Sequence, residues 1–240
     1  MAIGELWLVR HGESVGNAAA THAERAGLDV IPLESRDADV ELSPTGVEQA
    51  AALGGWLADR RPFIDAIWVS PYVRARQTLA IALGDGAPPL VTIDERLRDR
   101  ELGVLDLLTR RGVARLHPEE AERRRRLGKF YHRPPSGESW ADVALRLRSF
   151  LQDAGTHRAE AALVVAHDAV VMLFLYLLLP MTEDELLEFA ASHTVLNASV
   201  THVVRRDGRW HVAEFSTVDH LVHSGADVTA HPGNPDVHPE

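Results

Sequence analysis

Short apolar runs alternate with longer segments of helical spacing along this chain. We interpret the runs as buried strands and the segments between them as helices. Strands that alternate with helices in this way predict an α/β fold with a mainly parallel sheet. The expected buried strands are Glu5–Val9, Ala66–Val69, Leu90–Ile93 and Ala162–Ala166.

Several of the expected helices have recognisable first residues. Ser43-Pro44 places a capping residue before a first-turn proline and opens a helix toward Arg60. Ser70-Pro71 has the same pattern and opens a helix toward Leu83. Capping-box patterns predict two more helices, which begin after Ser139 and Thr182.

The pattern predicts one domain over residues 1–223 and a flexible C-terminal tail over residues 224–240. Within the domain, Asp207-Gly208 separates two apolar segments and predicts a hairpin. From His223 onward the chain is rich in Gly, Pro, Asp and His and has no periodicity, which predicts the tail. Thr109–Pro135 is the least regular part of the body, and we expect it to pass over one end of the sheet.

The composition excludes several classes of protein. The 240 residues are 45% apolar and 25% charged, close to the average for globular proteins. The absence of cysteine excludes disulfides, thiolate zinc sites and cysteine nucleophiles. The first residues lack a signal-peptide pattern. The most apolar segment, Leu163–Leu179, contains His167 and Asp168, which favours a buried strand and helix over a membrane span. We therefore expect a cytoplasmic protein without a membrane partner.

The charge narrows the choice of ligands. A formal net charge of −10 repels nucleic acid, so no nucleic-acid partner is expected. An anionic ligand would need arginines concentrated in its own site. The run Arg123–Arg126 follows Glu119, Glu120 and Glu122, and we interpret it mainly as a solvated helix face.

The first candidate for chemistry is Arg10-His11-Gly12, at the carboxyl end of the first expected strand. Arginine offers a permanently charged, forked donor to a phosphate. Histidine can act as a nucleophile or as an acid and base near neutral pH. An ordinary strand-to-helix turn with a capping histidine could have the same residues, so the pattern alone does not decide.

Two other expected strands end in residues of the same chemistry. His167 follows Ala162–Ala166, and Arg74 lies in the first turn of a helix, where free N–H groups favour an anion. Parallel strands bring their carboxyl ends to one edge of the sheet, so we expect these residues to meet Arg10 and His11. Two arginines and two histidines suit a tetrahedral oxyanion. The two arginines would repel a metal ion and no ligand spacing such as His-x-x-x-His is present, so no metal is expected.

Four segments resemble, in the same order, the motifs of the histidine phosphatase superfamily, which has the phosphoglycerate mutase-like fold. The resemblance extends from Leu6 to about Thr217 and implies a three-layer sandwich, with a mainly parallel sheet flanked by helices. It also implies that His11, Arg10, Arg74 and His167 are catalytic. The matching segments are Leu8–Ser14 (Arg-His-Gly-Glu), Leu42–Ala50 (Leu-[Ser/Thr]-x-x-Gly-x-x-Gln-Ala), Ser70–Thr78 (Ser-x-x-x-Arg-x-x-Gln-Thr) and Val164–His167 (the second-histidine strand).

Within that superfamily, the middle of the chain resembles the fructose-2,6-bisphosphatase branch. The resemblance implies that Arg125 and Lys129 hold the second phosphate of a sugar bisphosphate, and that Asn17 reaches toward the phosphoryl group. A solvated helix end explains Arg125 and Lys129 equally well. The segments that carry this resemblance include Pro118–Glu120, Lys129-Phe130 and Pro135–Ser139.

Two positions depart from the family pattern. The family's proton donor is a glutamate in a Leu-x-Glu-x-x-x-Gly element, and Asp99 occupies that place here, with Glu101 two residues further on. We expect Asp99 to be the donor and keep Glu101 as the alternative. The second departure is Asp168, which stands where the family has Gly, or Gln in the bisphosphatase branch. A carboxylate there repels a phosphate unless it pairs with an arginine or turns away, which argues against the bisphosphatase substrate.

The resemblance implies hydrolysis of a small phosphorylated, sugar phosphate-like metabolite through a phosphohistidine on His11, with no cofactor. Asp99 would have to be protonated to serve the leaving oxygen, so we expect the bound phosphate and Asp168 to raise its pKa. A cofactor-dependent phosphoglycerate mutase is one alternative. A catalytically silent relative that binds a phosphorylated ligand is another.

Overall fold

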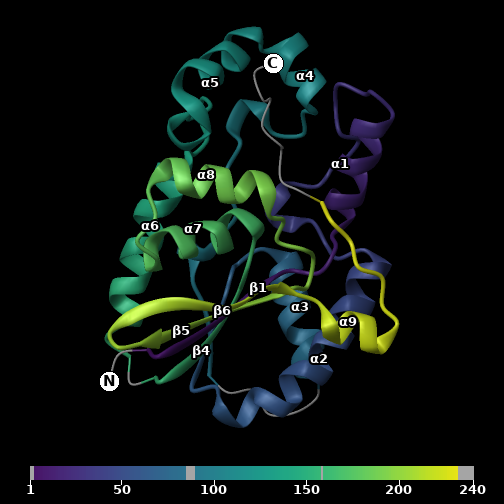
Figure 1. Ribbon diagram of the computed structural model, residues 1–240. Coiled ribbons are helices and arrows are strands. Elements are labelled where there is room, and N and C mark those ends of the chain that lie inside the picture. Colours follow the sequence, from purple (N-terminus) through teal and green to yellow (C-terminus); the bar gives the residue numbers. More distant parts are fainter. Residues whose placement is uncertain (1–2, 85–89, 158, 232–240) are drawn as a thin grey trace.

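The computed structural model describes residues 3–84, 90–157 and 159–231. These residues form a six-stranded sheet of order β3-β2-β4-β1-β5-β6 (Figure 1). The first four strands run parallel, and β5 and β6 complete one side of the sheet as antiparallel neighbours. The mainly parallel α/β sheet is thus confirmed. The strands are β1 Glu5–Arg10, β2 Ala66–Val69, β3 Val91–Ile93, β4 Ala161–Ala166, β5 Val200–Arg206 and β6 Arg209–Thr217.

Helices cover both faces of the sheet, because successive side chains of a strand point to opposite faces. In β1, Leu6 and Leu8 pack in one core with residues of α6 and α7. Trp7 and Val9 pack in a second core with residues of α2 and α3. The expected three layers are therefore present. The helices are α1 Val15–Arg25, α2 Pro44–Arg60, α3 Val73–Leu83, α4 Arg110–Leu116, α5 Pro118–Tyr131, α6 Trp140–Ala154, α7 Asp168–Leu178, α8 Glu183–Ser192 and α9 Asp219–Ser224, with 3₁₀ turns at Asp37–Asp39, Arg61–Phe63, Glu95–Leu97 and Gly103–Leu105.

Most of the expected caps are confirmed, and one is wrong. Ser43 accepts a hydrogen bond from Gly46 N at the start of α2, and Ser139 and Thr182 form capping boxes. Ser70-Pro71 does not open α3, which begins at Val73. The Ser70 hydroxyl instead lies 2.8 Å from His167 Nε2.

The expected hairpin is confirmed. Asp207 and Gly208 join β5 to β6 with φ angles of 50° and 77°. Two successive left-handed residues give a turn whose twist matches that of the flanking strands.

The segment expected to be irregular, Thr109–Pro135, contains α4 and α5, which lie beyond α6 and α8 at one end of the molecule (Figure 1). Charged residues dominate α5, so its sequence lacks the apolar spacing that would have marked a helix. No helix of the described residues is long and apolar enough to cross a membrane.

The start of the expected tail is tied to the body of the protein. After α9 the chain runs along α1 (Figure 1), and residues 227–231 make hydrogen bonds to buried side chains. Buried donors and acceptors that find partners in this segment fix its position. Residues 232–240 lie outside the described residues, so a flexible tail over that stretch stays a prediction.

Candidate active site

Two adjacent strands bring the two histidines together. Arg10, the last residue of β1, pairs with Ala166, the last residue of β4. His11 and His167 follow these residues, and the centroids of their rings lie 5.1 Å apart. The convergence expected from the strand ends is therefore present, although most of the chain separates the two residues.

The geometry of His11 leaves Nε2 free of a proton. Nδ1 lies 2.7 Å from Gly12 O, and because a carbonyl only accepts, the ring proton lies on Nδ1. Arg74 Nε donates to His11 Nε2 over 3.2 Å. Burial and the charges of Arg74, His167 and Arg10 lower the pKa of His11 well below its usual value, although the bond to Gly12 opposes this shift. His11 is therefore neutral near pH 7, with the lone pair of Nε2 in the site.

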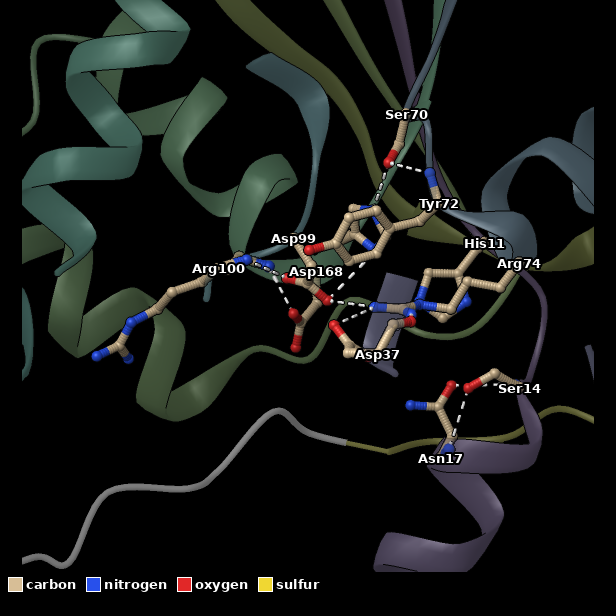
Figure 2. Close-up of polar contacts among 12 residues, drawn as sticks. His11, Ser14, Asn17, Asp37, Ser70, Tyr72, Arg74, Asp99, Arg100 and Asp168 are labelled. Carbon is tan, nitrogen blue, oxygen red and sulfur yellow. Dashed lines mark hydrogen bonds and ion pairs between the residues drawn. The ribbon is translucent and has the colours of Figure 1, made fainter. Parts of the chain in front are cut away.

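Arg74 connects His11 to two carboxylates (Figure 2). Its Nη2 lies 3.0 Å from Asp99 Oδ2, and its Nη1 lies 2.9 Å from Asp37 Oδ1. Asp37 also accepts a bond from Arg74 Nη1 through its main-chain oxygen, at 2.6 Å. No pattern in the sequence marks Asp37, because it lies in a 3₁₀ turn, outside every motif.

Arg10 is held by main-chain oxygens. Its Nη1 donates to Val195 O over 2.6 Å, and its Nη2 donates to His231 O over 2.8 Å. Its Nε is buried and has no hydrogen-bond partner among the described residues. This buried donor is available to an anion, and burial lowers the pKa of the guanidinium.

His167 lies between Ser70 and Asp99. Its Nε2 lies 2.8 Å from Ser70 Oγ, and its Nδ1 lies 3.3 Å from Asp99 Oδ2. Burial lowers the pKa of His167, although the charge of Asp99 acts in the opposite direction. The sequence marked Ser70 only as a helix cap, whereas the structure gives it the role of orienting this ring.

Asp99 and Glu101 have different surroundings. Asp99 contacts Arg74 and His167, and its Oδ1 accepts a hydrogen bond from Arg100 N over 2.8 Å. Glu101 is exposed and accepts a hydrogen bond from Tyr72 Oη over 2.9 Å. Of the two carboxylates, Asp99 is the one that the structure places with the histidines.

The pKa of Asp99 is displaced away from the value that a proton donor needs. Burial alone would raise this pKa, but the charges of His167 and Arg74 and the hydrogen bond from Arg100 N together hold it well below the usual range. In the structure Asp99 is therefore ionised at neutral pH. We expected a bound phosphate and Asp168 to raise this pKa. With Asp168 in place the pKa is nevertheless lowered, so that part of the expectation is wrong, and only the effect of a bound phosphate remains a prediction.

Asp168 is the first residue of α7, and its Oδ1 accepts a hydrogen bond from Ala169 N over 2.6 Å. Its charge acts on Arg10, where it partly offsets the lowering of the arginine pKa by burial. An acidic residue after the second histidine is thus accommodated at a helix N-terminus and beside an arginine.

The three residues expected to bind substrate contact other residues of the protein. Asn17 belongs to the capping box of α1, and its Oδ1 also accepts a hydrogen bond from Asn197 Nδ2 over 3.2 Å. Arg125 is exposed on α5 and pairs with Glu122 of the same helix. Lys129 Nζ lies 4.6 Å from the ring centroid of Trp140. A substrate-binding role for these residues stays a prediction.

Three residues of the site are also of the types that bind metal ions. His11, Asp99 and His167 have ligand atoms within 4.8 Å of one another. Arg74, however, already donates to His11 Nε2 and to Asp99 Oδ2. A cation would have to displace this guanidinium from the same atoms, so the cluster favours an anion.

A tight contact between two backbones fixes the turn that carries His11. A Cβ on Gly46 would lie 1.9 Å from Glu13 O, and a Cβ on Gly12 would lie 2.6 Å from Gly46 O. Both positions therefore require glycine, which lets α2 touch the turn directly. Glu13 N also donates to Gln49 Oε1 of the same helix over 2.8 Å.

Known proteins resemble the chain over nearly its whole length. A metal-independent phosphoserine phosphatase of Arabidopsis thaliana is 30% identical over 222 residues, which cover 91% of this chain and 84% of that protein. The 6-phosphofructo-2-kinase/fructose-2,6-bisphosphatase 1 of Mus musculus is 30% identical over 194 residues, which cover 80% of this chain but only 36% of that protein. A mycobacterial glucosyl-3-phosphoglycerate phosphatase, solved with VO3, superposes with a TM-score of 0.71 at 25% identity and covers 89% of this chain and 99% of its own.

These relatives include both a phosphoserine phosphatase and a bisphosphatase, so the similarity does not single out the bisphosphatase branch. The sequence profile of the histidine phosphatase superfamily (branch 1) matches residues 6–217, which include all the residues of the cluster. The chain belongs to the histidine phosphatase superfamily.

Proposed function

We propose that the protein hydrolyses monoesters of phosphate with His11 Nε2 as the nucleophile. The observation that carries the proposal is the state of His11: a buried, neutral ring whose proton is held on Nδ1 by Gly12 O, with Nε2 beside the Arg74 guanidinium. When a phosphoryl group binds, Arg74 Nε exchanges its hydrogen bond to Nε2 for one to a phosphoryl oxygen. The Nε2 lone pair is then free for in-line attack on phosphorus beside a positive charge.

The first step transfers the phosphoryl group to the enzyme. His11 Nε2 forms a bond to phosphorus, the bond from phosphorus to the ester oxygen breaks, and that oxygen takes a proton from Asp99. Arg74, Arg10 Nε and His167 stabilise the charge that shifts among the other phosphoryl oxygens. In the second step water attacks phosphorus, Asp99 takes the proton of that water, and the bond to Nε2 breaks, which releases phosphate.

The low pKa of Asp99 determines where its proton comes from. Because Asp99 is ionised before substrate binds, the proton has to arrive with the monoanion of the ester. Transfer of that proton to Asp99 leaves the ester as a dianion, which pairs with Arg74 in place of a carboxylate.

The surroundings of the cluster favour an ester whose alcohol has an amine over one with a second phosphate. Asp37 pairs with Arg74, and the charge of Asp168 acts on Arg10. Burial and the charges of Asp37 and Glu101 raise the pKa of Asp106, so these carboxyl groups lie close enough to repel one another. A second phosphate would meet this negative charge, whereas an ammonium group would offset it. The Arabidopsis relative is named for phosphoserine, which has such an amine.

The test combines turnover with trapping of the intermediate. The protein is incubated with nitrophenyl phosphate, O-phosphoserine and glucose 6-phosphate, with and without EDTA and with and without 2,3-bisphosphoglycerate. We expect phosphate release that survives EDTA and needs no bisphosphoglycerate, and higher kcat/KM for phosphoserine than for the sugar phosphate. Brief reaction with a ³²P-labelled substrate should leave an acid-labile label on the protein.

His11→Asn should abolish both turnover and labelling, whereas His223→Asn, on the exposed face of α9, should keep them. A tenth or more of the wild-type rate in His11→Asn would contradict the assignment of the nucleophile. Binding of substrate without release of phosphate would support a silent binding protein instead. Loss of activity in EDTA that a divalent ion restores would contradict the metal-free site.

A further inference from the structure

The segment after α9 forms a strap across the turn that carries the nucleophile. We call residues 227–231 the C-terminal strap. Gln49 Nε2 donates to Asp227 O over 2.8 Å and to Thr229 Oγ1 over 2.9 Å. Asn197 N donates to Thr229 O over 3.2 Å, and Thr229 Oγ1 donates to Asn197 Oδ1 over 3.2 Å. Every second residue of the strap thus contacts the body of the protein.

The side chains that hold the strap also hold the nucleophile turn. Gln49 and Asn197 are both completely buried. Gln49 Oε1 accepts a hydrogen bond from Glu13 N over 2.8 Å, and Asn197 Nδ2 donates to His11 O over 3.2 Å. Each amide therefore contacts the strap on one side and the turn with His11 on the other, so that the two segments are fixed together.

His231, at the end of the strap, contacts this region directly. Its main-chain oxygen accepts a hydrogen bond from Arg10 Nη2 over 2.8 Å. Its Nε2 lies 2.6 Å from Glu13 Oε2, and its Nδ1 lies 2.5 Å from Thr21 Oγ1. The imidazole is therefore held at both nitrogens, and this fixes the carbonyl of the same residue against Arg10.

The contact with His231 helps to fix the orientation of the Arg10 guanidinium. Nη1 donates to Val195 O and Nη2 donates to His231 O, whereas the buried Nε has no hydrogen-bond partner among the described residues. If His231 moved away, Nη2 would lose its acceptor and the guanidinium could turn. The orientation of a guanidinium matters for phosphate binding because its donors have a fixed planar geometry.

We propose that His231 is a positioning residue of the active site and that the strap completes the phosphoryl pocket by orienting Arg10. The proposal rests on the proposed function, since it assigns Arg10 to the phosphoryl group. His231 would then determine anion affinity from outside residues 6–217, which the family profile matches. The composition of the surrounding segment is typical of a linker.

The test measures anion affinity directly, so that it does not depend on turnover. Inorganic phosphate is titrated by calorimetry against the protein and its His231→Ala, His231→Gln and His223→Ala variants. Alanine keeps the main-chain oxygen but loses the imidazole that holds it against Arg10. We therefore expect His231→Ala to weaken phosphate binding by about tenfold or more, which is the typical effect of one hydrogen bond to a charged group. Glutamine can still donate to Glu13, so His231→Gln should recover much of the affinity. His223→Ala, on exposed α9, should match wild type.

Turnover gives the second measurement. In His231→Ala we expect KM and the inhibition constant of vanadate to rise by similar factors and kcat to change much less, because the nucleophile and Asp99 are intact. In an Arg10→Gln background, His231→Ala should have little further effect on phosphate affinity. A structural role alone would lower the melting temperature without this dependence on Arg10.

Thr229→Val tests the strap with a change that keeps the side-chain volume. It removes the hydroxyl between Gln49 and Asn197 and should weaken phosphate binding in the same direction, by a smaller factor. Phosphate affinity within twofold of wild type in His231→Ala would overturn the proposal and leave the hydrolysis untouched. Absence of turnover in wild type would overturn the proposed function, and the phosphate titrations would still decide the role of His231.

Discussion

Replacing Asp99 by asparagine should separate the contribution of proton transfer from that of the attack by His11. Asparagine keeps the size of the side chain and one oxygen for Arg74, but it cannot deliver or accept the proton. General acid catalysis typically contributes about 10²–10⁴-fold. We expect a loss of about that size for an alkyl ester such as O-phosphoserine.

The leaving group provides the internal control. Nitrophenolate departs without a proton, so Asp99→Asn should reduce the hydrolysis of nitrophenyl phosphate by a much smaller factor. The remaining loss reflects the proton that water gives up in the second step. Glu101→Gln removes the charge of Glu101 but keeps an oxygen that can accept from Tyr72 Oη, and it should keep the wild-type ratio of the two rates. The rates are measured by phosphate release under identical conditions.

Anion affinity should change in the direction opposite to the rate. The Asp99 carboxylate competes with a phosphate for Arg74, and a charge pair at 4 Å is worth about 4 kcal/mol at an effective dielectric constant of 20. Asp99 is partly exposed, so the gain on its removal should be well below that figure. Asp99→Asn should therefore bind phosphate more tightly than wild type while it turns over more slowly.

The pH profile gives a further check on Asp99. Because its pKa is lowered, the free enzyme lacks the proton that the leaving oxygen needs, and the ester monoanion has to supply it. Above the second pKa of the ester, about 6, kcat/KM for phosphoserine should fall about tenfold per pH unit.

In the comparison of leaving groups, equal losses for both esters in Asp99→Asn would refute the assignment of Asp99 as the proton donor. A selective loss in Glu101→Gln would transfer that role to Glu101.

Three further predictions concern the surroundings of the nucleophile. Gly46→Ala should lower the free energy of unfolding by about 1–3 kcal/mol and impair turnover, because its Cβ would lie 1.9 Å from Glu13 O. The control is Gly55→Ala in the same helix, where a Cβ has open space, and this variant should be neutral or stabilising in urea unfolding. Asp37→Asn removes a negative charge beside Arg74 and should lower the inhibition constant of vanadate; an unchanged or higher constant would mean that Asp37 mainly positions Arg74. The folded state holds His11 neutral, whereas the unfolded state takes up a proton below about pH 6.5, so the free energy of unfolding should fall as the pH drops below that value. His11→Gln should reduce this slope by up to about 1.4 kcal/mol per pH unit. Equal slopes in the two proteins would contradict the lowered pKa of His11.

The sequence predicts those parts of the site that depend on strand ends. Apolar runs place β1, β2 and β4, and the rule that parallel strands end at one edge brings His11, Arg74 and His167 together. The same reasoning does not find Asp37, because a 3₁₀ turn outside the sheet has no periodic signal. It also assigns Ser70 to a cap, since a serine followed by a proline is a pattern that opens helices.

The environment of a side chain is harder to predict than its position. Asp99 is found by its place in a motif, but the direction of its pKa shift depends on the distances to Arg74 and His167. Composition likewise predicts a loose tail from residue 224, because Gly, Pro and Asp are typical of linkers. The buried amides of Gln49 and Asn197 that hold residues 227–231 come from distant parts of the chain, and only the folded structure shows where they meet the strap.

The position of β1 in the sheet has a consequence for how the protein is made. Its two neighbours are β4 and β5, which are synthesised long after it. Leu6, Trp7, Leu8 and Val9 are apolar on both faces of the strand, and until residue 206 has left the ribosome they have no complete set of partners. An unpaired apolar strand on a nascent chain is prone to aggregate and is a typical chaperone substrate. Because the pairing of β1 with β4 also brings the two histidines together, recovery of turnover during refolding should report the docking of the first strand, after much of the helical structure has formed.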